Sequence, residues 1–191
     1  MSKLDIGLWI QYSWAVLAAI WLITLPFTKK TRQSLTGKSL AVQRIIFLVG
    51  FFLIGSDYFR QGWLGRYFLP ENRSIPATGL ALTMAGCLFA IWARLILGAN
   101  WSGTAKVKEG HELIVKGPYR FVRHPIYTGI ITACIGTTLA IGEWRCIMGL
   151  IVVLLGLVLK MTQEERLMIA TFPQAYPQYR RRVKALIPGL L

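Results

Sequence analysis

Residues 124–160 read HPIYTGIITACIGTTLAIGEWRCIMGLIVVLLGLVLK, and this stretch decides the fold. After Arg123 the chain carries no charged side chain until Glu143, and after Arg145 it carries none until Lys160. A helix needs roughly 20 mostly apolar residues to cross the hydrocarbon core of a bilayer. We therefore predict a tight helical hairpin in a membrane, whose second helix continues past the membrane edge beyond Lys160.

The composition of the whole chain also favours a membrane protein. Of its 191 residues, 54% are hydrophobic and 16% are charged, and the mean hydropathy is +0.50, whereas soluble chains have about 25% charged residues. The formal charge is +14, but the cations punctuate the apolar runs and form no surface stripe, so we expect no nucleic-acid partner. The three cysteines stand singly in apolar runs without ligand spacing, so we expect neither a disulfide framework nor a metal site.

Three further apolar runs precede the hairpin, at Leu8–Phe27, at about Leu40–Phe59 and between Arg73 and Arg94. The first is too long for the core of a signal peptide, so we interpret it as a retained anchor. The sequence thus predicts an all-α polytopic membrane protein with about five transmembrane helices in a single domain, residues 1–191. Its three N-terminal spans occupy residues 1–98, and residues 99–191 form a catalytic region with a cytoplasmic loop and C-terminal helices.

The distribution of Lys and Arg predicts the orientation of these helices. The first loop holds five cations and no acid: Lys29, Lys30, Arg32, Lys38 and Arg44. The third loop and the C-terminal tail are also basic, whereas the second loop mixes three arginines with Asp57 and Glu71. We therefore expect the first loop, the third loop and the C-terminus to be cytoplasmic, and the N-terminus to lie outside.

Two polar segments contain residues that a simple connection between helices would not require. Residues 106–127, KVKEGHELIVKGPYRFVRHPIY, hold both histidines of the chain and several turn formers, which suits a ligand-binding loop. An alternative is a basic membrane boundary with interfacial aromatic residues. Residues 160–183, KMTQEERLMIATFPQAYPQYRRRV, contain Pro173 and Pro177, which we expect to break the helical pattern.

Together these segments resemble the catalytic region of the isoprenylcysteine carboxyl methyltransferase family of integral membrane enzymes. The first signature is carried by Gly117-Pro118-Tyr119 and Arg123-His124-Pro125-x-Tyr127-x-Gly129, and the second by Glu164-Glu165, Phe172, Tyr176 and Tyr179. The resemblance covers about residues 99–188 and implies S-adenosylmethionine as the cofactor and a lipophilic methyl acceptor in or at the bilayer. The chain is similar in length to prokaryotic members, which implies a location in the inner, cytoplasmic membrane.

The resemblance also implies roles for individual residues. The cofactor site would comprise His111, Glu112, Leu113, Ile114, Tyr119, His124, Pro125, Ile126, Tyr127 and Glu164. Lys160 stands one helical turn before Glu164, where an arginine of the eukaryotic enzymes is associated with the substrate, so we predict Lys160 as the substrate residue and Lys160 with Glu164 as the catalytic pair. The alternatives are ordinary: a capping role for His124, interfacial anchoring by Tyr119 and Tyr127, and an exposed carboxylate at Glu164.

Methyl transfer from a sulfonium to a carboxylate needs no general base, because the acceptor is already an anion. An amine or thiol acceptor would need a proton acceptor, for which Glu165, Glu112 and His124 are candidates. The rival functions are a phospholipid N-methyltransferase, a sterol-reductase-like enzyme that binds NADPH, and a non-catalytic membrane subunit.

Overall fold

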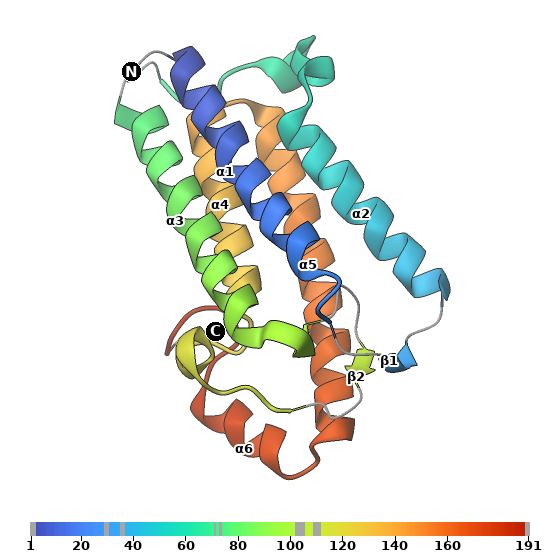
Figure 1. Ribbon diagram of the computed structural model, residues 1–191. Helices are drawn as coiled ribbons and strands as arrows, with labels where there is room; N and C mark the ends of the chain where they lie inside the picture. Colours follow the sequence, from blue (N-terminus) through green and yellow to red (C-terminus); the bar gives the residue numbers. More distant parts are fainter. Residues whose placement is uncertain are drawn as a thin grey trace.

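The computed structural model describes residues 3–28, 31–34, 37–70, 72, 74–101, 106–108 and 112–189. Within them the α-helices are α1 (Lys3–Thr24), α2 (Gly37–Gly55), α3 (Ser74–Leu97), α4 (Pro125–Ile141), α5 (Trp144–Thr171) and α6 (Ala175–Arg182) (Figure 1). The predicted all-α fold is confirmed, with one small addition. The strands β1 (Thr31–Ser34) and β2 (Lys106–Lys108) form an antiparallel pair.

The apolar helices confirm an integral membrane protein. Three stretches are long and apolar enough to cross a bilayer: Leu4–Thr24, Ser74–Asn100 and Trp144–Thr171. Two shorter apolar helices, Leu40–Gly55 and Pro125–Ile141, accompany them, so the number of five spans stays a prediction. The predicted hairpin is present as α4 and α5, with Gly142 in a left-handed conformation (φ 74°) between them.

Three helix limits differ from the predictions. α2 ends at Gly55, so Asp57 lies in a following 3-10 turn, and α3 continues past Arg94 to Leu97. Pro177 does not break the helix in which it lies, because it occupies the first turn of α6, where backbone N–H groups have no intrahelical acceptor and proline costs little.

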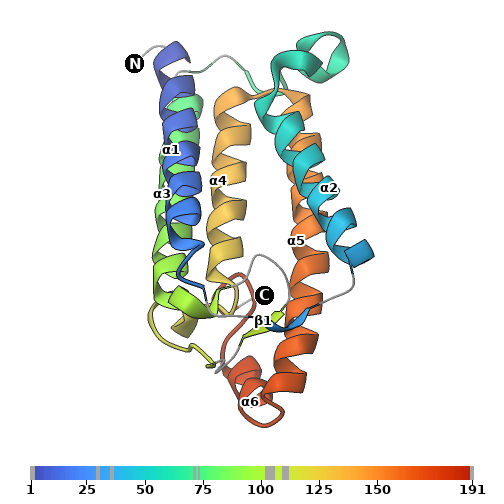
Figure 2. The same ribbon diagram turned by 45° about the vertical axis from the view of Figure 1, so that its right-hand side comes forward.

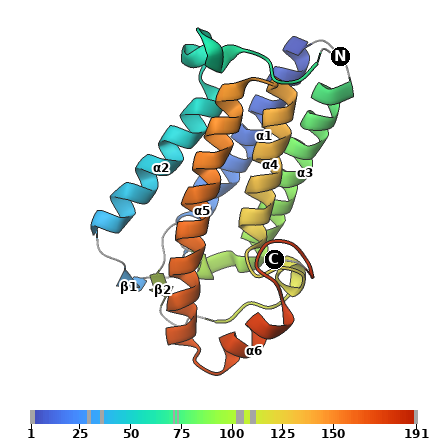
Figure 3. The same cartoon turned by 180° about the vertical axis from the view of Figure 1, so that it is seen from behind.

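The closest helix packing joins α3 and α4, which lie side by side in Figure 3. Glycines at positions 79, 86, 129 and 136 let the two backbones meet. A Cβ added at Gly86 would lie 2.4 Å from the backbone nitrogen of Ala133 and 2.5 Å from the carbonyl oxygen of Gly129. Small residues allow this approach in a membrane, where van der Waals contact drives helix association.

A buried ion pair ties α2 to the hairpin turn. The Arg145 guanidinium pairs with Glu143, and both side chains are only 2% exposed. Arg145 also donates hydrogen bonds to the backbone carbonyls of Leu53 and Ile54, in the last turn of α2, and of Ser56, just after it. These carbonyls have no partner within the helix, so Arg145 caps α2. In Figure 2, α2 lies beside α5, while α1, α3 and α4 form the other group of helices.

Short backbone pairings gather the loops at two opposite ends of the bundle. The β1–β2 pair joins the first and third loops at the end where α6 and the C-terminus also lie (Figure 1). At the other end, a bridge between Tyr67 and Glu143 joins the second loop to the hairpin turn. The predicted common end for the first loop, third loop and C-terminus is thus observed, and the side of the membrane that it faces stays a prediction.

Candidate active site

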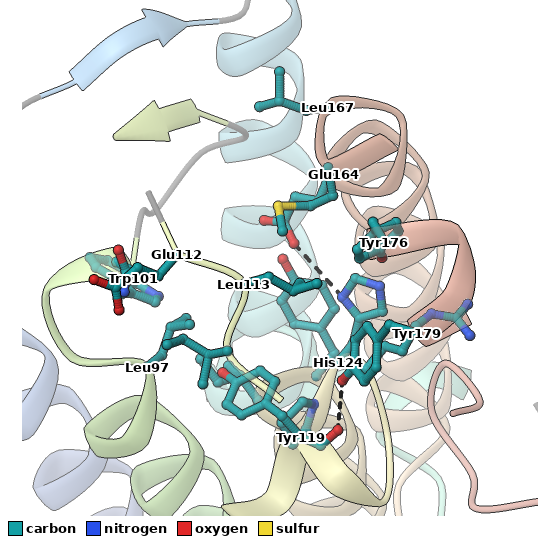
Figure 4. A pocket seen from close by; sticks show the side chains of 17 residues that line it. Leu97, Trp101, Glu112, Leu113, Tyr119, His124, Glu164, Leu167, Tyr176 and Tyr179 are labelled. Atoms are coloured by element: carbon teal, nitrogen blue, oxygen red, sulfur yellow. Dashed lines mark hydrogen bonds and ion pairs between the residues drawn. The ribbon is translucent and has the colours of Figure 1, made fainter. Parts of the chain in front are cut away.

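A pocket opens at the end of the bundle where α6 lies, between α3, the segment that leads into α4, and α5 with α6 (Figure 4). Its wall is mostly apolar and aromatic, with a few polar groups turned inward, as is usual for small-molecule sites. The lining residues are Leu97, Asn100, Trp101, Glu112, Leu113, Ile114, Tyr119, Arg123, His124, Pro125, Ile126, Tyr127, Glu164, Leu167, Met168, Tyr176 and Tyr179.

The structure brings almost all of the predicted site residues together. Nine line the pocket, namely Glu112, Leu113, Ile114, Tyr119, His124, Pro125, Ile126, Tyr127 and Glu164. His111 lies outside the described residues. Lys160 stands next to the lining rather than in it, with its Nζ 3.8 Å from Glu164 Oε1 and 5.4 Å from the centre of the Tyr127 ring. The predicted shared helix face of Lys160 and Glu164 is therefore present, while their roles stay predictions.

His124 lies between two carboxylates. Its Nε2 is 3.2 Å from Glu165 Oε1, and its Nδ1 is 3.9 Å from Glu164 Oε2. The imidazole ring stacks on Tyr127, with the ring centres 5.3 Å apart and the planes 3° from parallel. Although His124 occupies the residue before α4, its side chain makes no capping hydrogen bond, so the capping interpretation is wrong.

Glu165 is the centre of a buried ion network. Arg123 approaches Glu165 Oε1 with Nη2 at 2.6 Å and Nε at 3.0 Å, and Arg180 Nε lies 3.4 Å from Glu165 Oε2. The side chains of Arg123 and Glu165 are 7% and 12% exposed. Both donors of Arg123 meet the same carboxylate oxygen, and such charge-assisted hydrogen bonds are among the stronger ones in proteins. This pair fixes the last turns of α5 against the entry to α4.

These last turns lie beyond the membrane-spanning part of α5. With 28 residues, α5 is about 42 Å long at 1.5 Å per residue, against about 30 Å of hydrocarbon core. Burial alone would raise the pKa of Glu165, but hydrogen bonds from His124 and Arg123 and their charges outweigh it and lower the pKa to about 2. Glu165 is therefore an anion at neutral pH and a poor proton acceptor, which removes one of the three candidate bases.

Three tyrosines close the pocket from the side of α6 and the turn before α4. Tyr119 and Tyr176 are buried, and the Tyr179 hydroxyl donates a hydrogen bond of 2.6 Å to the carbonyl oxygen of Tyr119 (Figure 4). Burial raises the pKa of Tyr179 to about 12, so its hydroxyl remains a neutral donor. Burial also argues against interfacial anchoring by Tyr119, whose ring forms part of the pocket wall.

Comparisons with known proteins agree with this geometry. Residues 79–170 match the model of the isoprenylcysteine carboxyl methyltransferase (ICMT) family. This match covers a little less than half of the chain. A curated member from Schizosaccharomyces pombe, protein-S-isoprenylcysteine O-methyltransferase, is 32% identical over 90 residues, which are 44% of this chain and 36% of that protein. The chain thus spans little more than a third of that relative's length.

Two further comparisons gave matches, one to a short stretch of sequence and one to a solved structure. The uncharacterized protein YpbQ of Bacillus subtilis is 45% identical over 40 residues, or 21% of this chain and 24% of that protein. The solved structure of a eukaryotic intramembrane Ras methyltransferase, ICMT, superposes with a TM-score of 0.52 at 23% identity and covers 82% of this chain and 54% of the other. The latter likeness shows a shared fold.

The residues matched to the ICMT family include His124, Tyr127 and Glu164 but stop before α6. Eight lining residues were not among the predicted site residues: the signature residues Arg123, Tyr176 and Tyr179, and also Leu97, Asn100, Trp101, Leu167 and Met168. The last two follow Glu164 by three and four positions, so helical periodicity alone could have found them. Trp101 has no such signal, because it is placed by a tertiary contact: the buried Arg94 guanidinium lies 4.4 Å from the centre of its ring.

Proposed function

We propose that this protein is an S-adenosylmethionine-dependent methyltransferase of the ICMT family that esterifies the carboxylate of a lipophilic acceptor at the cytoplasmic edge of the membrane. The observation that carries the proposal is the meeting of His124 and Tyr127 from the first signature with Glu164 from the second in one pocket. These residues stand about 40 positions apart in the chain, and only the α4–α5 hairpin brings them together.

The chemistry of the lining suits this cofactor. Glu164 is an acceptor for the ammonium or ribose hydroxyls of S-adenosylmethionine, and a charge-assisted hydrogen bond of this kind is among the stronger ones in proteins. The first turn of α4 begins at Pro125, so the N–H groups of Ile126 and Tyr127 have no acceptor within the helix and suit the cofactor's carboxylate. The aromatic wall of Trp101 and Tyr119 offers apolar surface for the rest of the molecule.

When bound, the cofactor supplies an electrophilic methyl group on a positive sulfur. Glu164 and the first turn of α4 would hold the cofactor so that its methyl group could pass to an oxygen of the acceptor carboxylate, with the electron pair of the broken carbon–sulfur bond left on a neutral thioether. Lys160 attracts the acceptor carboxylate and, from its position beside Glu164, holds it near the cofactor. Proximity and exclusion of water are then the protein's main contributions.

A carboxylate acceptor fits the site better than an amine. An amine must lose a proton during methylation, which requires a free base. Arg123, Arg180 and His124 surround Glu165, and both nitrogens of His124 face carboxylates. Glu165 and His124 are therefore engaged with other groups, and Glu112 in the pocket lining is the remaining candidate base for an amine, whereas a carboxylate acceptor needs none.

Titration calorimetry on two variants tests the proposal. Glu164→Gln should weaken S-adenosylmethionine binding roughly ten- to a hundredfold, as expected for a hydrogen bond to a charged group. Lys160→Met keeps the aliphatic stem, so cofactor binding should survive while turnover of an anionic lipophilic acceptor falls. Arg166→Gln changes a charge on an exposed part of the same helix and is the matched control.

Two results would contradict the proposal. A folded wild-type protein that binds NADPH but not S-adenosylmethionine belongs to the reductase class. If Lys160→Met abolishes cofactor binding while Glu164→Gln leaves it unchanged, the two roles are reversed.

A further inference from the structure

The C-terminal residues Val183–Ile187 form a strap along the start of α4. Val122 and Lys184 form a parallel backbone bridge, and the N–H groups of Arg123 and His124 donate to the carbonyls of Lys184 (2.8 Å) and Ala185 (3.0 Å). Beyond them, the Thr128 hydroxyl donates to the carbonyl of Leu186 at 2.8 Å. The strap therefore runs up to the first turn of α4.

The length of α4 sets the depth of this strap in the membrane. With 17 residues, α4 is about 26 Å long, slightly less than the roughly 30 Å of hydrocarbon core. The predicted crossing by α4 would use every turn of the helix and would place the residues just before Pro125 at the level of the lipid headgroups. Leu186, which is bonded to Thr128, would then lie at the boundary of the hydrocarbon.

Near the strap, the exposed side chains combine apolar groups with cations, as is typical of a membrane–water interface. Phe121 is 54% exposed and Ile187 is 46% exposed. Beside them Arg120 and Lys184 are exposed, and neither forms an ion pair in the described part of the chain. The sequence has no Asp or Glu in residues 113–142 or 166–191, and Glu165, which lies just outside these ranges, pairs with Arg123 and Arg180.

We propose that Arg120, Phe121, Lys184 and Ile187 form a binding ledge for the headgroup of an anionic phospholipid. The two cations would contact the lipid phosphate, and the two apolar side chains would insert beside the upper acyl chains. Because the strap is bonded to the backbone of Arg123 and His124, a lipid on the ledge would also hold the wall of the pocket.

Native mass spectrometry of the full chain in neutral detergent, titrated with phosphatidylglycerol or phosphatidylcholine, tests the ledge without any cofactor. The double variant Arg120→Gln/Lys184→Gln should bind phosphatidylglycerol about thirtyfold more weakly, because each cation near an anionic membrane surface strengthens binding roughly fivefold. The matched control is Arg181→Gln/Arg182→Gln, which removes the same charge from exposed residues of α6, at the far end of the molecule from the hairpin turn (Figure 1). It should lose less than about threefold.

Three results would overturn the ledge. The first is equal affinity of the wild type for the two lipids. The second is an equal loss in both double variants, which would show a diffuse charge effect. The third is displacement of the lipid by an equal concentration of inorganic phosphate, which would show a site for free anions. None of these results depends on methyl transfer, so the proposed enzymatic function is tested separately.

Discussion

Replacing Gly86 by alanine tests how closely the two central helices must approach. The added methyl group would lie 2.4 Å from the Ala133 nitrogen and 2.5 Å from the Gly129 carbonyl oxygen, about an ångström inside ordinary contact. Both atoms belong to the backbone of α4, so no side chain can rotate away and the helices must separate. Overpacking of this kind costs about 1–3 kcal/mol.

The assay is reversible unfolding in detergent, followed by circular dichroism. Gly7→Ala in α1 is the control, because nothing lies within 4 Å of a Cβ there, and alanine gains up to about 1 kcal/mol of helix propensity. We expect Gly86→Ala to be destabilised and Gly7→Ala to be unchanged or stabilised. A second substitution, Gly129→Ala, forces the same separation, so the double variant should lose less than the sum of the two single losses. Stability of Gly86→Ala equal to that of the wild type would refute the close approach.

Three further outcomes follow from the site and the bundle. The pKa of Glu165 is about 2 in the folded protein, against 4.5 for an ordinary glutamate. Its contribution to the free energy of unfolding is therefore complete above pH 4.5 and is lost as the pH falls toward 2. Glu165→Gln should therefore be less stable than the wild type at pH 7, on the order of 3 kcal/mol, and unfolding curves at decreasing pH should converge; a constant gap would contradict the ion network. Tyr179→Phe removes the hydrogen bond to the Tyr119 carbonyl and should cost about 1 kcal/mol of unfolding free energy, with a weaker affinity for S-adenosylmethionine by calorimetry; unchanged values for both would show that this bond is dispensable. Accessibility tags at residue 110 and at the C-terminus should report the cytoplasmic side, and a tag within residues 142–144 the opposite side; a common side for residue 110 and the turn would show that the hairpin does not cross.

The sequence was sufficient for the helical architecture. Long uncharged runs have few alternatives to membrane helices, because a bilayer leaves unpaired backbone groups no solvent partner. The interruption at Glu143 and Arg145 located the hairpin correctly, and the i, i+4 spacing of Lys160 and Glu164 correctly placed both side chains on one face. Charge was a poorer guide to helix limits: Arg94 was used as a boundary, yet it is buried inside α3 and bonded to backbone carbonyls.

Tertiary contacts explain what the sequence could not predict about the site. The two signatures indicated a shared pocket, but the pairing of Arg123 with Glu165 depends on where α5 stands relative to α4. Trp101 enters the wall only because Arg94 lies against its ring. Likewise, the glycine spacing in α3 and α4 has no meaning until the register of the two helices is known.

The Glu143–Arg145 pair also bears on how the chain enters the membrane. An isolated arginine in the α4–α5 turn would oppose transfer of that turn across the bilayer, since cations favour the side from which insertion begins. Pairing with Glu143 lowers the cost of carrying the Arg145 charge through the bilayer, and we expect the two helices to insert as one unit. The bonds from Arg145 to the end of α2 can form only after this passage. Arg145, which would hinder insertion if it were unpaired, would thus stabilise the hairpin against α2 once it has been inserted.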